Sequence, residues 1–184
     1  MSRRLKLGIS SCLLGAKVRY DGGHKRDSFL TDTFGRFVEW IPVCPEVECG
    51  LPVPREAMRL VGVPDAPRLV ANLTGTDHTE RMVRWAQEKI GYLKSAGICG
   101  FISKSKSPSS GMQGVEVYTP SGEVAGSGAG IFARIFINSF PLLPIEDDVR
   151  LRDPVLRESF IERVFVAGTL LDPKTETGLR YYRR

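Results

Sequence analysis

Short apolar runs alternate with longer segments of helical periodicity along this chain. Alternating, β-branched or aromatic positions predict strands over residues 5–10, 37–43, 68–73, 98–103 and 115–118. Apolar residues at helical spacing predict helices over residues 28–34, 77–96 and 156–166. A fourth helix is predicted over residues 131–140 from the length of this segment and the proline that follows it. Strands that alternate with helices favour an α/β fold. We therefore expect a three-layer, Rossmann-like domain with a mainly parallel central sheet.

The segment 77–96 has the clearest helical pattern. Asp77 is a candidate cap, Glu80 follows three residues later, and Gly97 is a typical stop. One face of this helix is apolar and carries Met82, Ala86, Ile90 and Leu93. In contrast, the proline- and glycine-rich segment 45–54 predicts a loop without helix.

The composition is that of one globular domain, because 184 residues are enough to bury a core. We expect this domain over residues 1–166 and a less certain tail over residues 167–184. The chain has no apolar run of about 18 residues, and its N-terminus is a poor signal peptide. We therefore expect a cytoplasmic protein without a membrane partner, whose thiols stay reduced. The net charge of +5 permits a polyanionic partner, but the charge is spread out, and a solvated surface is the favoured interpretation.

Three of the four cysteines lie where predicted strands end. Cys12 follows the first strand, and Cys44 and Cys49 follow the second. A third polar loop, residues 104–114, follows the strand at 98–103. The carboxyl ends of parallel strands share one edge of the sheet, so these loops predict a single cleft with metal-binding thiols.

Five short motifs give these loops a family resemblance. They are Ser-Cys-Leu-Leu-Gly at 11–15, Val-Arg-Tyr-Asp-Gly at 18–22, Val-Cys-Pro-Glu at 43–46, Gly-Leu at 50–51 with Pro-Arg at 54–55, and Ser-Pro-Ser-Ser-Gly at 107–111. Over residues 5–145 the chain resembles the TudS-type thiouracil desulfidases, a former domain of unknown function. Cys49 and the Ser-Pro-Ser-Ser-Gly-Met variant also resemble the N-terminal domain of RudS-type enzymes. Those enzymes remove sulfur from 4-thiouridine in tRNA, and the resemblance implies that residues 167–184 are a truncated second domain.

The resemblance implies a [4Fe–4S] cluster held by three cysteines, with one iron open to the substrate sulfur. Cys12 and Cys44 match two of these ligands. The third family cysteine is replaced by Ser110, and a serine hydroxyl is a poor ligand for this iron. Cys49 is the preferred third ligand, and Cys99 is the alternative, although a buried structural thiol is the common outcome for Cys99.

The implied reaction is a non-redox desulfidation of a thiolated uracil, either a free base or nucleoside or 4-thiouridine within tRNA. Glu46 is the expected general acid/base, and Ser107 and Ser109 relay a proton or bind the ring. The expected substrate-binding residues are Arg19, Tyr20, Asp21, Lys104, Ser110 and Gly111. For Tyr20 and Asp21, fixing the turn at Gly22-Gly23 is an alternative role.

Two other kinds of protein stay open on the sequence. One is a non-catalytic RNA- or nucleotide-binding module, which would bind with strong salt dependence. The other is a structural domain that carries a metal. Zinc is disfavoured in that case because His24 and His78 have no ligand spacing. The oligomeric state is not predicted.

Overall fold

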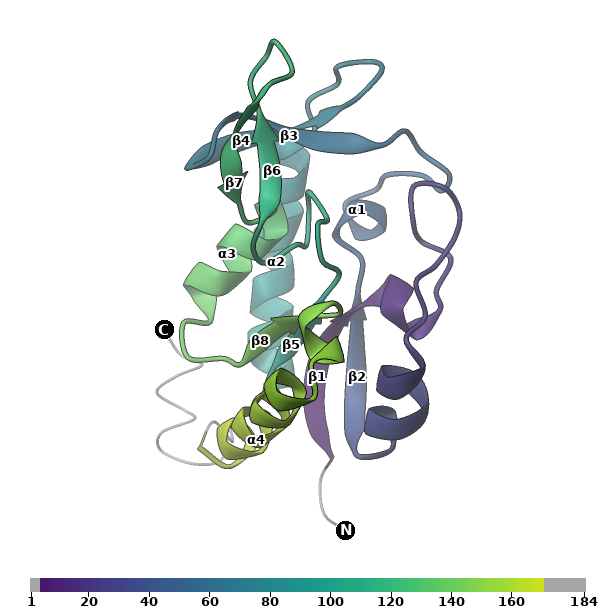
Figure 1. Cartoon of the computed structure of the whole chain (residues 1–184), viewed down its shortest axis with the longest axis vertical. Coiled ribbons are helices and arrows are strands. Elements are labelled where there is room, and N and C mark those ends of the chain that lie inside the picture. The colour runs from purple at the N-terminus through teal and green to yellow at the C-terminus, as the bar shows by residue number, and fades with distance from the viewer. Residues whose placement is uncertain (1–3, 171–184) are drawn as a thin grey trace.

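The computed structural model describes residues 4–170 and contains a parallel sheet, here called sheet A (Figure 1). Its strands lie in the order β2–β1–β5–β8 and all pair in parallel. Their bounds are Leu5–Ser10 for β1, Val38–Val43 for β2, Phe101–Ser103 for β5 and Ile145–Asp147 for β8. The predicted α/β class with a parallel sheet is therefore confirmed.

A second four-stranded sheet, sheet B, was not anticipated. Its order is β4–β3–β6–β7, with one parallel pair, β3–β6, between two antiparallel pairs. The bounds are Met58–Val63 for β3, Ala66–Ala71 for β4, Val115–Tyr118 for β6 and Val124–Gly128 for β7. The sequence missed β3 and β7, and it placed β4 at 68–73. Strand β7 reads Val-Ala-Gly-Ser-Gly and has no buried residue, so it carries no apolar alternation.

The long helices lie close to their predicted positions. They are α2 at Thr79–Ala96, α3 at Ile131–Ser139 and α4 at Pro154–Leu170. The four apolar residues predicted for one face of α2 are buried, and Gly97 ends the helix with a left-handed φ of 68°. Asp77 accepts a hydrogen bond from the backbone N–H of Thr79 at 2.9 Å, although His78 occupies the cap position. Helix α4 continues past residue 166, and residues 171–184 of the predicted tail lie outside the described residues.

Two short segments correct the sequence interpretation. The predicted helix at 28–34 is a π-helical turn at Phe29–Thr33 followed by a 3-10 turn at Phe34–Arg36. The predicted loop at 45–54 begins with a helix of one turn, α1, at Pro45–Glu48. Proline is accepted at the first helical position because the N–H that it lacks has no partner there in any helix. The prediction of a helix-free loop was therefore wrong at its first residues.

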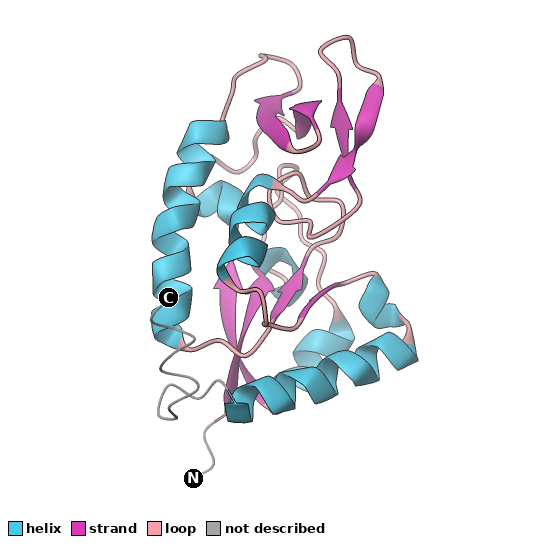
Figure 2. Ribbon diagram, turned by 90° about the vertical axis from the view of Figure 1, so that its left-hand side faces the viewer, coloured by secondary structure: helices cyan, strands magenta, loops and turns pink. Residues whose placement is uncertain are grey.

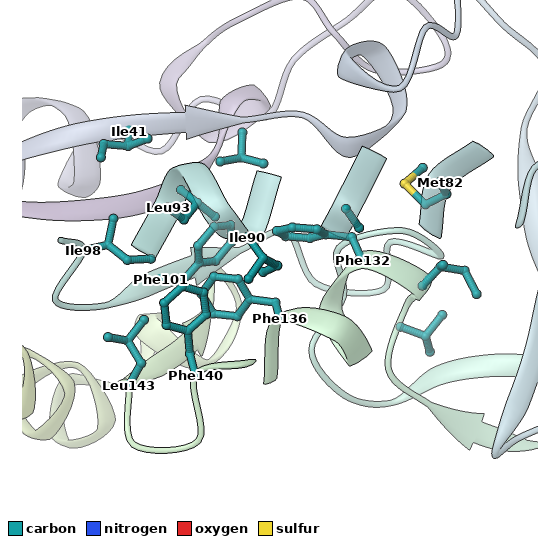
Figure 3. Packing of buried hydrophobic residues seen from close by; sticks show 14 of the residues in the cluster. Ile41, Met82, Ile90, Leu93, Ile98, Phe101, Phe132, Phe136, Phe140 and Leu143 are labelled. Atoms are coloured by element: carbon teal, nitrogen blue, oxygen red, sulfur yellow. The ribbon is translucent and has the colours of Figure 1, made fainter. Parts of the chain in front are cut away.

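Helices lie on both faces of sheet A (Figures 1 and 2). Buried hydrophobic residues form a core cluster on each of these faces. On one face, Phe101 packs against Phe136, with ring centroids 4.7 Å apart, beneath α2 and α3 (Figure 3). This cluster also contains Leu60 and Val117 of sheet B, so one core joins the two sheets. The other face packs against α4 and the turns after β1. Within residues 4–170, no helix is both long enough and apolar enough to cross a membrane.

Gly8 in β1 permits this packing. Its register partner on β5 is Phe101, whose ring covers the space that a side chain would fill. A Cβ atom at position 8 would lie 2.3 Å from Cδ2 of Phe101. The ring thus lies directly on the backbone of β1, and the two strands that lead into the cleft are held together.

Candidate functional site

A cleft of about 260 Å³ opens where β1, β2 and β5 end. The segments after these strands form its walls, together with the start of β3. The cleft brings together most of the residues predicted from the sequence, namely Cys12, Arg19, Tyr20, Cys44, Glu46, Lys104, Ser107, Ser109 and Ser110. The expected convergence of the strand-end loops is therefore observed.

Cys12 lies on a 3-10 helix, Ser11–Leu14, which Gly15 ends with a left-handed φ of 93°. Its thiol is buried, and burial raises its pKa to about 11, with a further rise from the charge of Cys44. The nearby positive charges of Lys104 and Arg19 act in the opposite direction. Burial likewise raises the pKa of Cys44, which precedes α1. These two thiols line one cleft, and without a metal both prefer the neutral form.

Cys49 does not line the cleft. It follows the last residue of α1 and packs against the core cluster beneath α2 and α3. Its Sγ donates a hydrogen bond to the carbonyl oxygen of Glu46 at 3.2 Å. Ser110, in contrast, does line the cleft.

Cys99 lies near the amino ends of the sheet A strands, where its N–H donates to the carbonyl of Lys6 at 2.8 Å. It is buried in the core cluster on the α4 face, and it is not among the cleft residues. This position is at the opposite end of β5 from the cleft, as the sequence interpretation expected for a structural thiol.

Glu46 is held on two sides. Its Oε2 accepts a hydrogen bond from Nε of Arg55 at 2.8 Å, and it also contacts Nη2. The two side chains are largely buried, with 13% of Glu46 and 6% of Arg55 exposed. On the other side, Oε1 accepts the hydroxyl proton of Ser109 at 2.8 Å.

The two serine hydroxyls extend this contact into a chain. The Oγ atoms of Ser107 and Ser109 are 3.0 Å apart. Because Ser109 has one hydroxyl proton and donates it to Glu46, Ser107 must be the donor to Ser109. Ser107 Oγ in turn accepts the N–H groups of Ser109 and Ser110, at 3.3 and 3.1 Å. The hydrogen bonds therefore run from the hydroxyl of Ser107 through that of Ser109 to the carboxylate of Glu46.

Lys104 is fixed on the cleft wall rather than free. Its Nζ lies 2.9 Å from Oδ2 of Asp148, and its backbone N–H donates to Oγ of Ser10 at 2.9 Å. Oδ1 of Asp148 also accepts the N–H of Ser105 at 2.7 Å. Asp148 follows β8, and through these contacts it ties the end of β8 to the loop after β5.

Three predicted substrate-binding residues have different positions. Arg19 and Tyr20 line the cleft, with the guanidinium 5.5 Å from the ring centroid. Asp21 lies outside the cleft and is exposed. Its carboxylate accepts the N–H of Gly23 at 2.9 Å and lies 3.5 Å from Nε of Arg19. Those bonds lower the pKa of Asp21, so its role here is to hold the turn.

Gly111 also lies outside the cleft, and its N–H donates to the carbonyl of Ser107 at 2.9 Å. A Cβ atom there would lie 2.6 Å from Cγ2 of Val115. Gly111 therefore allows the serine loop to close tightly, and its N–H is already used.

Sequence reasoning missed two residues of the site. Arg55 was seen only as part of a motif, and Asp148 was not singled out at all. Arg55 acts through Glu46, nine residues earlier, and Asp148 acts through Lys104, which is 44 residues earlier. The signal for Arg55 was its place in the Pro54-Arg55 motif, whereas Asp148 follows a three-residue strand that the pattern did not reveal.

The chain is similar to known proteins over most of its length. A family model described as 2-thiouracil desulfurase matches residues 7–148. An uncharacterized protein, YbbK of Bacillus subtilis (strain 168), is 29% identical over 126 residues, which are 65% of this chain and 83% of that protein. Among solved structures, the [4Fe-4S]-dependent thiouracil desulfidase TudS is similar with a TM-score of 0.64 and 30% identity. That match covers 85% of this chain and 99% of TudS.

The cleft fits a [4Fe–4S] cluster only in part. Cys12 and Cys44 supply two thiols on its wall, and Ser110 supplies a hydroxyl. Over residues 4–170, no three His, Cys, Asp or Glu side chains are grouped so that they could hold a metal ion. In the conformation described, the thiols of the cleft account for two of the three ligands that the resemblance implies, and the third is not in place.

Proposed function

Because the chain belongs to the 2-thiouracil desulfurase family, we propose that it removes sulfur from a thiolated uracil without a redox step. Water supplies the oxygen, so a C=S group and H₂O give a C=O group and H₂S. The observation that carries this proposal is the hydroxyl chain from Ser107 through Ser109 to Glu46, in the same cleft as Cys12 and Cys44.

The proposed cofactor is a [4Fe–4S] cluster, the cofactor named for the similar TudS structure. Cys12 and Cys44 would hold it, and Cys49 remains the proposed third ligand because a serine hydroxyl is a poor ligand for its iron. When bound, the cluster would supply an iron that acts as a Lewis acid toward the thiocarbonyl sulfur.

The side chains of the cleft have distinct proposed roles. Glu46 takes up the proton of the attacking water through Ser109 and Ser107, and later returns it to the leaving sulfur. Arg55 holds the carboxylate of Glu46 in position through the buried ion pair. Arg19 and Lys104 provide positive charge that binds the ring oxygen.

The proposed substrate is 4-thiouridine in tRNA, or a free thiouracil or thiouridine. We propose the cytoplasm as its location, where the free thiols of Cys12, Cys44 and Cys49 stay reduced. The division into a domain at 1–166 and a separate segment at 167–184, and with it the RudS-type subtype, stays a prediction.

The test is anaerobic reconstitution with iron and sulfide, followed by incubation with 4-thiouridine and with 2-thiouracil. The wild-type protein should release sulfide while the long-wavelength absorption of 4-thiouridine disappears. Cys12→Ala should lose both the iron and the activity, whereas Cys99→Ala, a change at the other end of β5, should retain both. A Cys12→Ala protein with full activity would refute the proposal.

A further inference from the structure

The two serines of the proposed proton path lie on the loop between β5 and β6, residues 104–114. The second half of this loop is bound to the first turn of α3. The N–H groups of Ile131 and Ala133 donate to the carbonyl oxygens of Pro108 and Ser109, at 3.1 and 3.2 Å. The first N–H groups of a helix have no partner within the helix, and here the loop carbonyls satisfy two of them. Helix α3 therefore fixes the backbone at Ser109.

The first half of the loop is bound to Asp148 instead, which follows β8 at the edge of sheet A. Oδ1 of Asp148 accepts the N–H of Ser105 at 2.7 Å, and Oδ2 lies 2.9 Å from Nζ of Lys104. The N–H of Asp148 donates to the carbonyl oxygen of Ser103 at 3.1 Å. Only 8% of the Asp148 side chain is exposed, so water competes little for these bonds. Asp148 thus fixes three successive residues where the loop begins.

Lys106 lies between the two fixed halves and has an unfavourable backbone conformation. Its φ of 57° is in the left-handed region, and among residues 4–170 it is the one non-glycine residue with a positive φ. Its side chain is exposed and makes no hydrogen bond or ion pair within the same residues, so it does not impose this φ. Such a conformation persists only where the surrounding structure enforces it. The anchors at Asp148 and α3 supply that constraint.

We propose that Asp148 is a positioning residue for the desulfidation. By holding Ser105 it keeps the backbone at Lys106 in the left-handed conformation, and this places Ser107 within hydrogen-bond distance of Ser109. The inference rests on the proposed function, because the proton path from the attacking water runs through these two serines.

Loss of the anchor should disturb the serine chain at its weakest contacts. Without Asp148, Lys106 relaxes to a negative φ and Ser107 moves with it. The N–H groups of its own turn bind Ser107 Oγ at 3.1 and 3.3 Å, and these long bonds oppose the movement only weakly. The 3.0 Å contact between Ser107 Oγ and Ser109 Oγ is then lost. A displacement of about 1 Å in a reacting group can lower a rate about 100-fold.

Glu146, two residues before Asp148, provides the matched control. Its side chain is equally buried, with 9% exposed, and it forms ion pairs with Arg150 at 2.8 Å and Arg163 at 3.6 Å. Those arginines belong to the turn after β8 and to α4, and neither lines the cleft. A change at Glu146 therefore removes a buried carboxylate near Asp148 without releasing the loop.

The first experiment measures kcat and KM of the reconstituted protein with 4-thiouridine. Asp148→Ala should lower kcat about 100-fold and leave KM nearly unchanged, whereas Glu146→Ala should change neither. Asp148→Asn keeps an oxygen that can accept the N–H of Ser105, so it should retain most of the wild-type kcat. Adding Lys106→Gly to Asp148→Ala should restore part of kcat, because glycine adopts a positive φ readily.

The second experiment follows the loop without reference to activity. In hydrogen–deuterium exchange, peptides that cover residues 104–114 should exchange faster in Asp148→Ala than in the wild type, and at the wild-type rate in Glu146→Ala. If Asp148→Ala does not fold, the double variant Lys104→Met, Asp148→Ala takes its place here, because it leaves no unpaired charge.

Equal kcat values for Asp148→Ala and Glu146→Ala, or unchanged exchange of residues 104–114, would overturn the positioning role and leave the desulfidase proposal standing. A kcat that stays equally low after Lys106→Gly is added would also overturn it, since the loss would not arise at that backbone. If the wild-type protein releases no sulfide, the desulfidase proposal fails. Faster exchange confined to Asp148→Ala would then still support the anchor, and wild-type exchange would refute it.

Discussion

Glu46 and Arg55 form a buried pair in which each side chain needs the other. Removing one partner leaves a charge with little access to water, which costs about 3–5 kcal/mol. Glu46→Gln should therefore lower the free energy of unfolding by this amount and reduce sulfide release about 10²–10⁴-fold. Urea unfolding and a sulfide assay measure the two effects.

The double variant Glu46→Gln, Arg55→Met separates stability from catalysis. Without the unpaired guanidinium it should regain much of the lost stability, while sulfide release stays low. If the double variant regained activity together with stability, Glu46 would have only a structural role.

The third ligand of the proposed cluster can also be tested at single residues. Cys49→Ser removes the thiol but keeps a hydroxyl that can still donate to the carbonyl of Glu46. It should lower the iron bound per chain after anaerobic reconstitution, whereas Ser110→Ala should leave it unchanged. The reverse pattern, with iron lost only in Ser110→Ala, would assign the ligand to the cleft serine instead.

At the scale of elements, β1 and β5 pack through the ring of Phe101, which leaves no space for a side chain at Gly8. Gly8→Ala should lower the free energy of unfolding by about 1–3 kcal/mol, because the new methyl overlaps the buried ring of Phe101. Gly91→Ala on α2 is the matched control. Nothing lies within 4 Å of its Cβ position, so the change should stabilise the protein by up to about 1 kcal/mol. A similar effect for both variants, measured by thermal unfolding, would contradict this account of the packing.

Elements with a strong local pattern could be predicted from the sequence. Helix α2 has a continuous apolar face and a glycine stop, and both were found. Strands β3, β7 and β8 were missed because their stability comes from neighbouring strands rather than from their own alternation. The cleft residues at strand ends could be predicted because they follow strands that pair in parallel. Parallel pairing alone brings the ends of these strands to one edge of the sheet. The partners Arg55 and Asp148 depend on three-dimensional contacts that no local pattern encodes.

At the scale of the whole molecule, one core joins both sheets. Phe132 and Phe136 lie in the same cluster as Leu60 and Val117, so sheet B should not unfold separately from sheet A. Phe136→Ala should lower stability by about 3–5 kcal/mol and shift a single transition. The two tryptophans report on different regions, because Trp85 packs on Phe132 and Trp40 on Phe34.

Single-tryptophan variants, Trp40→Phe and Trp85→Phe, allow each region to be followed alone. Their fluorescence transitions in urea should coincide, both with and without the Phe136→Ala change. Two separate midpoints would show that the regions around Trp40 and Trp85 unfold independently, which would contradict a single cooperative core.

The link between Lys104 and Asp148 has a consequence for the newly synthesised chain. Cys12 is synthesised early, but the loop after β5 that also lines the cleft is synthesised much later. The ion pair that fixes Lys104 of this loop can form only after Asp148 has been synthesised. Until Asp148 has been synthesised, the thiols of Cys12 and Cys44 have no complete cleft around them and are exposed to oxidants. If the chain binds the proposed cluster, that cluster can be inserted only into a nearly complete domain, and iron supply and oxygen tension during synthesis would then set the fraction of molecules that mature correctly.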